Sequence, residues 1–322
     1  MATSEEEMVM DDFRIAVVGV GATGAVLAAA LLNQNLETML VGRRPGQGET
    51  IRRTGIRISG EVNYQVSVPN FVDQIGLLKS FKPNLIFLST KTFHLPRVLE
   101  ELKGIFRDGT KIISTHNGLG TEDVIAETFG VDAAFRMSLN YGVSLKGPGE
   151  VEMAFFNRPN YLGGLTAENK ALGSRIAALF TNGGLHTECV DDIKLHVWKK
   201  MVMKCTMASI CAVTDRTLKQ ILDFPPAREI AENCFREVLA VAKARGYYLG
   251  EDYLRTALGY LEKAGAHKDS MCYDIAHKTP TEIDYLGGKV VEYARELGIA
   301  TPYYAAMTNL VKAMEDSYLR PQ

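Results

Sequence analysis

The fold is decided by the stretch Phe13-Arg-Ile-Ala-Val-Val-Gly-Val-Gly-Ala-Thr-Gly-Ala-Val-Leu-Ala-Ala-Ala-Leu-Leu32. The apolar run 15–18 is typical of a strand buried on both faces. Gly19, Gly21 and Gly24 follow with the spacing G-x-G-x-x-G, and small and apolar residues then continue to Leu32 in a helical pattern. Such a strand, turn and helix bind a pyrophosphate on the free N–H groups of the helix N-terminus.

The glycine motif alone is weak evidence, but the flanking strand and helix are the context that it requires. We therefore predict a dinucleotide site, with a merely structural glycine turn as the alternative. The residues predicted to contact the pyrophosphate are Gly19, Val20, Gly21, Ala22, Thr23 and Gly24.

The composition is that of an ordinary globular protein large enough for two domains. The chain has 322 residues, of which 46% are hydrophobic and 23% charged. A formal net charge of -2 gives no electrostatic reason to expect nucleic acid or a membrane as partner. Five cysteines without a C-x-x-C pair indicate reduced thiols and a cytoplasmic protein. The acidic stretch 1–12 is the opposite of a signal peptide, and we interpret it as a disordered tail.

The second strand, predicted over 37–42, ends in Arg43-Arg44. NAD-binding proteins usually place an acidic residue here for the ribose 2′-hydroxyl, whereas an arginine accommodates the 2′-phosphate of NADP. No acid stands at this strand end, so the sequence favours NADP(H), with Arg43 preferred for the phosphate. The alternative is a solvated basic turn.

Further strands are predicted over 84–90 and 111–115, with Lys91 and Asn117 just beyond their carboxyl ends. Ligands of open parallel sheets bind at this edge, so both side chains are candidates for contact with nicotinamide ribose, phosphate or substrate. A surface lysine and a turn asparagine are the alternatives. Alternation over 56–68 predicts a hairpin, and the β-like segment 133–162, with a turn at 147–149, could extend the sheet.

From Asp191 onward helical patterns replace strands. We predict an α/β fold: a Rossmann-type doubly wound parallel sheet followed by an all-helical C-terminal domain. The predicted boundaries are 1–12 for the tail, 13–190 for the NADP-binding domain and 191–322 for a helical domain for substrate and dimerisation.

The first long helix is predicted over 193–212. One face is largely apolar, with Trp198, Val202, Cys205, Ser209 and Ala212 at helical spacing. His196, Lys200 and Lys204 share another face. They form either a solvated basic face or a lysine whose proton is easier to lose because of repulsion and partial burial. Spacing alone favours the solvated face.

A later helix is predicted to start at Pro280-Thr281, with its core stripe at Ile283, Leu286, Val290, Tyr293 and Leu297. Glu282 and Asp284 would then lie in its first turn, where acids suit the helix dipole. Ser270 could cap a helix or lie on the surface. The six histidines are scattered, and no spacing predicts a metal site.

Taken together and in order, these motifs resemble the ketopantoate reductase (2-dehydropantoate 2-reductase) family from Arg14 to about Lys312. The matching stretches are 19–24, Arg43, Thr90-Lys91, His116-Asn-Gly-Leu-Gly120, Val197-Trp-Lys-Lys200 leading to Cys205, Asp269-Ser-Met271 with Asp274, and Thr281-Glu-Ile-Asp-Tyr285 followed by Gly288.

The resemblance implies an NADPH-dependent reduction of 2-dehydropantoate to pantoate, in pantothenate biosynthesis, by a cytoplasmic enzyme that is commonly a homodimer. It implies that Lys200 is the catalytic lysine at the substrate ketone and that Glu282 binds the substrate and completes the site. Asn117 and Lys91 resemble residues that position the nicotinamide end and the substrate, and Ser270 resembles the family serine at the substrate carboxylate.

Family asparagines that hold the substrate are replaced here by Lys204, Ala208, His267 and Gly287. Lys204 adds positive charge beside the expected reaction centre. We therefore keep open the hypothesis of another 2-keto acid, with a second anionic group. Two further alternatives are a non-catalytic NADP(H)-binding sensor and a dehydrogenase of the β-hydroxy acid or opine type.

Overall fold

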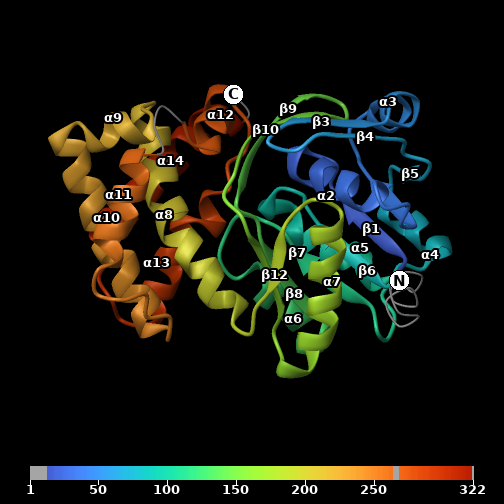
Figure 1. Cartoon of the computed structure of the whole chain (residues 1–322). Helices are drawn as coiled ribbons and strands as arrows, with labels where there is room; N and C mark the ends of the chain where they lie inside the picture. The colour runs from blue at the N-terminus through green and yellow to red at the C-terminus, as the bar shows by residue number, and fades with distance from the viewer. Residues whose placement is uncertain (1–12, 264–267, 321–322) are drawn as a thin grey trace. The chain divides into compact units, whose positions relative to one another are not determined.

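A computed structural model describes residues 13–263 and 268–320, so the expected tail 1–12 lies outside the described residues. Its contacts divide the described chain into two units, drawn in Figure 1. Unit 1 contains the described residues up to His116, together with Thr121–Lys194. Unit 2 contains Asn117–Gly120 and the described residues from Leu195 onward. The short segment Asn117–Gly120 therefore belongs by its contacts to unit 2, although both flanking residues belong to unit 1.

Unit 1 is built on an eight-stranded sheet with the order β12-β11-β8-β7-β6-β1-β2-β5. The neighbouring strands of the run β8-β7-β6-β1-β2-β5 pair in parallel. Strand β11 pairs antiparallel with β8 and parallel with β12. The strands are β1 (Ile15–Val18), β2 (Thr38–Val41), β5 (Phe71–Val72), β6 (Leu85–Leu88), β7 (Lys111–Ser114), β8 (Ala134–Ser138), β11 (Asn160–Gly164) and β12 (Thr187–Cys189). The predicted doubly wound α/β fold is confirmed.

The central strand β1 is buried on both faces, which explains its uninterrupted apolar sequence. Ile15 and Val17 pack into one hydrophobic cluster with helix α2 (Ala22–Leu32), while Ala16 and Val18 pack into a second cluster. The other helices of unit 1 are α3 (Gln47–Thr54), α4 (Leu78–Phe81), α5 (Leu95–Lys103), α6 (Thr121–Phe129) and α7 (Lys170–Asn182), with 3-10 turns η1 (Ile75–Leu77), η2 (Thr92–His94), η3 (Val131–Ala133) and η4 (Ala167–Asn169).

A second, four-stranded sheet has the order β4-β3-β10-β9. The predicted hairpin is confirmed as β3 (Ile56–Gly60) and β4 (Tyr64–Val66), and the predicted turn joins β9 (Tyr141–Gly147) to β10 (Glu150–Phe156). The expectation that 133–162 extends the main sheet holds only for β8 and β11. In β10, Val151 and Met153 are buried while Glu150 and Glu152 are exposed, so this strand suits a sheet that is covered on one face.

Helix α2 explains why the second sheet is needed. All eight residues from Gly24 to Leu31 are buried, and a helix that is apolar all round must be covered on every side. Val151, Met153 and Phe156 of the second sheet belong to the same hydrophobic cluster as α2. The helix is therefore enclosed by both sheets, as Figure 1 shows.

In the part of unit 2 that the structure describes, all regular elements are helical. They are α8 (Ile193–Thr214, entered from the last residues of unit 1), α9 (Leu218–Leu222), α10 (Pro225–Ala244), α11 (Tyr253–Lys263), α12 (Ser270–Ala276), η5 (Ile283–Tyr285), α13 (Gly287–Glu296) and α14 (Pro302–Leu319). The predicted apolar stripe of α8 is buried. None of the described helices is both long and apolar enough to cross a membrane.

The prediction of a helix starting at Pro280-Thr281 is wrong. Residues 283–285 form a 3-10 turn, and the α-helix begins only at Gly287, after Leu286 adopts φ -105° and ψ -107°. Thr281 Oγ1 accepts a hydrogen bond from the Ile283 N–H, which stabilises the short turn. Leu297 is 40% exposed and does not belong to the core stripe. Glu282 therefore precedes a tight turn and does not lie in the first turn of a long helix.

Candidate active site

The three glycines of the first loop differ in the space that a Cβ atom would have at each position. Gly19 has a φ of +97°, and a Cβ there would lie 2.7 Å from the backbone nitrogen of Thr90. A Cβ at Gly24 would lie 2.0 Å from the carbonyl oxygen of Gly19. A Cβ at Gly21, in contrast, would meet no described atom within 4 Å. Gly19 and Gly24 are thus required by the protein itself, while the space beside Gly21 is open to a ligand.

The start of α2 offers backbone donors for an anion. Gly21 is the N-cap residue and has no side chain with which to accept a bond from the first turn, where Ala22, Thr23 and Gly24 bring no acid. The loop is held by a residue that sequence reasoning missed: buried Gln47 donates from Nε2 to the carbonyl oxygen of Val20 over 2.6 Å. The free N–H groups and positive dipole of this helix end fit a pyrophosphate.

Arg43 follows β2 as predicted, but it is not simply a solvated turn residue. Its guanidinium donates to Glu101 Oε2 over 2.6 Å, and Arg97 donates to Glu101 Oε1 over 3.0 Å. The His94 pKa is lowered by burial and by the charges of Arg43 and Arg97, so three basic groups gather here. Glu101 lies on α5, far from the second strand in sequence, and no local motif signals it.

The end of β7 is fixed by a buried histidine. His116 Nδ1 shares a hydrogen bond with Ser114 Oγ over 3.0 Å, and its Nε2 shares one with Thr90 Oγ1 over 3.2 Å. Burial, with the nearby charge of Arg136, lowers the pKa of His116 to about 3. The ring is therefore neutral at physiological pH and ties the end of β7 to Thr90, which immediately precedes Lys91. The structure places Lys91 at the entry to η2.

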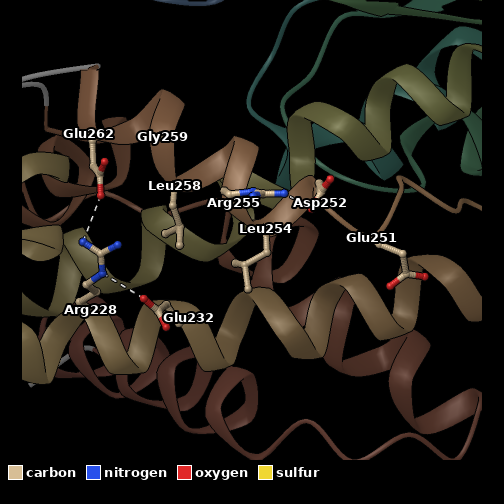
Figure 2. A pocket seen from close by; sticks show the side chains of 9 residues that line it. All are labelled: Arg228, Glu232, Glu251, Asp252, Leu254, Arg255, Leu258, Gly259 and Glu262. Atoms are coloured by element: carbon tan, nitrogen blue, oxygen red, sulfur yellow. Dashed lines mark hydrogen bonds and ion pairs between the residues drawn. The ribbon is translucent and has the colours of Figure 1, made fainter.

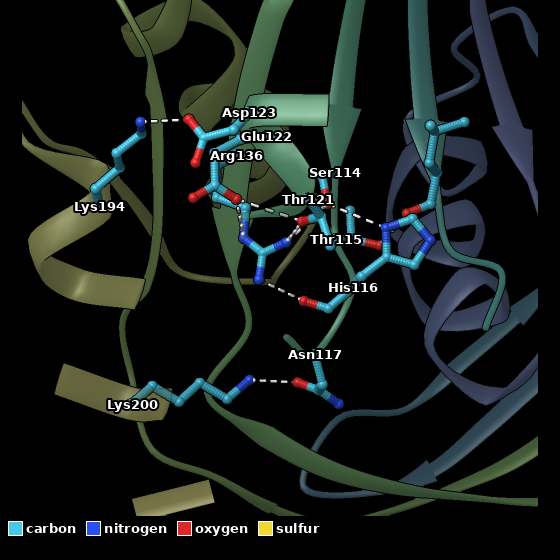
Figure 3. Close-up of polar contacts among 11 residues, drawn as sticks. Ser114, Thr115, His116, Asn117, Thr121, Glu122, Asp123, Arg136, Lys194 and Lys200 are labelled. Atoms are coloured by element: carbon cyan, nitrogen blue, oxygen red, sulfur yellow. Dashed lines mark hydrogen bonds and ion pairs between the residues drawn. The ribbon is translucent and has the colours of Figure 1, made fainter. Parts of the chain in front are cut away.

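Arg136 on β8 is the centre of a network shown in Figure 3 and is only 1% exposed. Its guanidinium donates to the carbonyl oxygen of His116 over 2.6 Å, to Ser114 Oγ over 2.7 Å and to Thr121 Oγ1. Its Nε lies 3.7 Å from buried Glu122. An arginine within an apolar strand gives no sequence signal for this role, because its partners come from β7 and α6.

Lys200 and Asn117 are brought together although 83 positions separate them. Lys200 Nζ donates to Asn117 Oδ1 over 2.8 Å, as drawn in Figure 3. The segment that carries Asn117 is also fixed by a hydrogen bond from the Leu119 N–H to the Tyr285 carbonyl oxygen over 2.9 Å. The interpretation of this α8 face as a solvated basic face is therefore wrong for Lys200, whereas neighbouring Lys199 is exposed.

One turn further along α8, Lys204 makes an ion pair that the sequence did not reveal. Its Nζ donates to Asp269 Oδ2 over 2.6 Å and to Ser270 Oγ over 2.9 Å. Burial would lower the pKa of Lys204, but the carboxylates of Asp269 and Glu282 outweigh burial and raise it. The structure thus brings Lys204, Ser270 and Glu282 together within unit 2, one turn of α8 away from Lys200.

Substrate-holding asparagines of the family are also replaced at other positions. Ala208 is fully buried, and a Cβ at Gly287 would lie 2.6 Å from Thr308 Oγ1, so neither offers a polar group. His267 lies outside the described residues. A separate pocket of about 430 Å³ lies beside α10 and α11. Its lining includes Arg228, which is already paired with Glu232 and Glu262 (Figure 2). Over residues 13–263 and 268–320, no cluster of His, Cys, Asp or Glu is suited to a metal ion.

Comparison with known proteins covers nearly the whole chain. The family model described as "Ketopantoate reductase PanE/ApbA" matches residues 15–166, and its C-terminal counterpart matches residues 192–315. The 2-dehydropantoate 2-reductase of Streptococcus pyogenes serotype M3 is 28% identical over 302 residues, covering 93% of this chain and 97% of its own.

Two solved structures extend the likeness to the fold. The 2-dehydropantoate 2-reductase of Geobacter metallireducens GS-15 has a TM-score of 0.86 at 25% identity, covering 93% of this chain and 99% of its own. A D-mandelate dehydrogenase in a ternary structure with NADH and anilino(oxo)acetate has a TM-score of 0.85 at 25% identity, covering 94% and 98%.

Proposed function

Because the chain belongs to the ketopantoate reductase family, we propose that it reduces a 2-keto acid to the 2-hydroxy acid with NADPH. The first candidate substrate is 2-dehydropantoate, which would make the product pantoate and the pathway pantothenate biosynthesis. The observation that carries the proposal is the hydrogen bond between Lys200 and Asn117, because it holds an ammonium group in place on a half-buried face.

On this proposal unit 1 binds the cofactor. The loop Gly19, Val20, Gly21, Ala22, Thr23 and Gly24 holds the pyrophosphate at the start of α2, which the open space beside Gly21 supports. Arg43 binds the 2′-phosphate, and Lys91 positions the nicotinamide end. Asn117, which belongs to unit 2 by its contacts, has the same positioning role in this proposal. The nicotinamide, when bound, supplies the hydride.

Unit 2 supplies the groups for the keto acid. Hydride arrival at C2 leaves negative charge on the ketone oxygen, and the Lys200 ammonium stabilises that charge and gives up a proton to it. Asn117 orients the ammonium through its Oδ1. Ser270 and Lys204 bind the substrate, and Glu282 binds it and completes the site.

A second candidate is a related reductase that takes another 2-keto acid or uses NADH. Two observations favour keeping it: the likeness to D-mandelate dehydrogenase, whose structure holds NADH, and the contact of Glu101 with Arg43, which places an acid near the expected 2′-phosphate. The family match favours both candidates over a β-hydroxy acid or opine dehydrogenase. A non-catalytic NADP(H) sensor stays the alternative from another class.

The test is NADPH oxidation, followed by nicotinamide absorbance, with 2-dehydropantoate and a panel of other 2-keto acids. We expect turnover, and a loss of at least about a hundredfold in kcat for Lys200→Met, as for removal of a positioned acid. Lys199→Met, one residue away but exposed, is the matched control and should keep full activity. Cofactor binding without turnover of any acid would support the sensor and overturn the proposal.

We also propose that the protein is a cytoplasmic homodimer, as the family resemblance implies. Sedimentation equilibrium at several concentrations should give about twice the chain mass of 35.5 kDa. A mass of one chain throughout would contradict the dimer without affecting the proposed reaction.

A further inference from the structure

The ion pair between Lys204 and Asp269 changes what Lys204 can recognise. The two side chains are 17% and 10% exposed, so their charges are poorly screened by solvent. Asp269 is also fixed from the other side: its Oδ1 accepts the Met271 N–H and caps α12. Both partners are therefore held in one arrangement, on α8 and at the start of α12.

The charges around Lys204 cancel locally. Lys200 and Lys204 bring two positive charges, while Asp269 and Glu282 bring two negative ones, and both carboxylates act on Lys204. A lysine at this position does not by itself create an anion site. The hypothesis of a second anionic group on the substrate rested on an uncompensated Lys204, and Asp269 removes that premise.

The pair still leaves Lys204 a hydrogen-bond donor. An ammonium group has three N–H bonds, of which one goes to Asp269 and one to Ser270. Among the residues that the structure describes, Lys204 Nζ has no third hydrogen-bond acceptor. A neutral oxygen of the substrate side chain, such as a hydroxyl, can accept the remaining bond, whereas a carboxylate would lie near the negative charges of Asp269 and Glu282.

We propose that the Lys204–Asp269 pair sets substrate charge selectivity: the site takes 2-keto acids whose only anionic group is the carboxylate beside the ketone, and it disfavours dicarboxylates. This inference rests on the proposed function, because it concerns the keto acid of that reaction. It assigns Asp269 a role in specificity that its residue type and position in the sequence do not indicate.

The test compares two acids of the same chain length, 2-oxopentanoate with one carboxylate and 2-oxoglutarate with two. Asp269→Asn removes the charge but keeps an oxygen that can cap α12, since asparagine is an equally good N-cap residue. Asp215→Asn is the matched control: it removes the same charge from an exposed neighbouring pair with Lys268, at 81% exposure of Asp215. Calorimetric binding in the presence of NADP⁺ and steady-state reduction with NADPH are both measured.

We expect the wild type to prefer 2-oxopentanoate. Asp269→Asn should raise the ratio of 2-oxoglutarate to 2-oxopentanoate affinity by at least about tenfold, mainly in KM, since one unscreened charge acts at short range. Asp215→Asn should change the ratio by less than about twofold, and Lys204→Gln combined with Asp269→Asn should return it toward the wild-type value.

The inference is overturned if the wild type prefers 2-oxoglutarate, if it binds neither acid, or if Asp269→Asn leaves the ratio unchanged. Binding that shifts as expected without any NADPH oxidation would support charge selectivity while refuting the proposed reaction. NADPH oxidation together with an affinity ratio that Asp269→Asn leaves unchanged would support the proposed reaction and refute charge selectivity. The failure of one proposal can therefore be distinguished from the failure of the other.

Discussion

Arg136 should be the most costly single polar residue of unit 1 to replace. Its guanidinium is 1% exposed and donates to three partners, including the carbonyl oxygen of His116 over 2.6 Å. Removing one partner of a buried ion pair costs about 3–5 kcal/mol because the other charge is left without compensation. Here Glu122, 3% exposed, would be that stranded charge. We expect Arg136→Met to lower the free energy of unfolding by this amount.

Urea unfolding followed by far-UV circular dichroism measures the loss, with the linear dependence of stability on urea compared between variants. Arg158→Met is the matched control, because Arg158 is 46% exposed and its nearest acidic partner is 4.0 Å away. It should lose less than about 1 kcal/mol. A double variant with Glu122→Gln should lose less than the sum of the two single changes, since neither charge is then stranded.

The reasoning would be refuted if Arg136→Met were as stable as Arg158→Met. It would also be refuted by strict additivity of Arg136→Met and Glu122→Gln, because additivity would mean that the two charges do not depend on each other. Either result would show that burial and contact in this network do not determine its energetic weight.

Three further outcomes are expected. Glu101→Gln, which frees Arg43 from a carboxylate at 2.6 Å, should lower KM for NADPH about three- to tenfold and leave that for NADH unchanged; equal gains with both cofactors would contradict this. Gly24→Ala should weaken NADPH binding at least about tenfold in fluorescence titration, because its Cβ would lie 2.0 Å from a backbone oxygen, while Gly259→Ala, in open space, should not. The His116 pKa is lowered from 6.5 to about 3, so between pH 6.5 and about pH 3 the unfolded chain takes up this proton while the folded chain does not. Stability should then fall by up to about 1.4 kcal/mol per pH unit, and acid titration of unfolding should show a shallower fall for His116→Gln.

The first loop was predictable because its signals lie close together in the sequence. Gly19, Gly21 and Gly24 follow one another within a short stretch, and the buried strand and helix on either side are visible as apolar runs. The backbone of Thr90, which excludes a side chain at Gly19, could not be identified from that stretch. The second sheet was less accessible to sequence reasoning. Its strands β9 and β10 look like extensions of the main sheet, and only the need to cover the far side of α2 decides otherwise.

In the candidate site, too, sequence patterns pointed to some residues, whereas contacts between distant segments had to be seen in the structure. Lys200 could be singled out, but helical spacing favoured solvent for it, and only contact with a segment 83 positions away shows that it is held. Asp269 was hidden because its partner lies 65 positions earlier in the chain. The prediction of a helix from Pro280 failed because Thr281 Oγ1 accepts the Ile283 N–H in a tight turn, while the Thr281 N–H donates to Glu315 Oε1, 34 positions away. Charge pairing and short turns depend on tertiary contacts that periodicity does not encode.

The parallel pairing of β3 with β10 has a consequence for biosynthesis. Arg57 of β3 is paired with Glu150 of β10, while the hairpin partner β4 covers only the opposite edge. A nascent polypeptide leaving the ribosome therefore exposes one unpaired strand edge until Glu150 has emerged. Unpaired edges of this kind promote aggregation. We therefore expect a chain truncated just before residue 150 to be less soluble than the full chain, because this edge of β3 then stays unpaired.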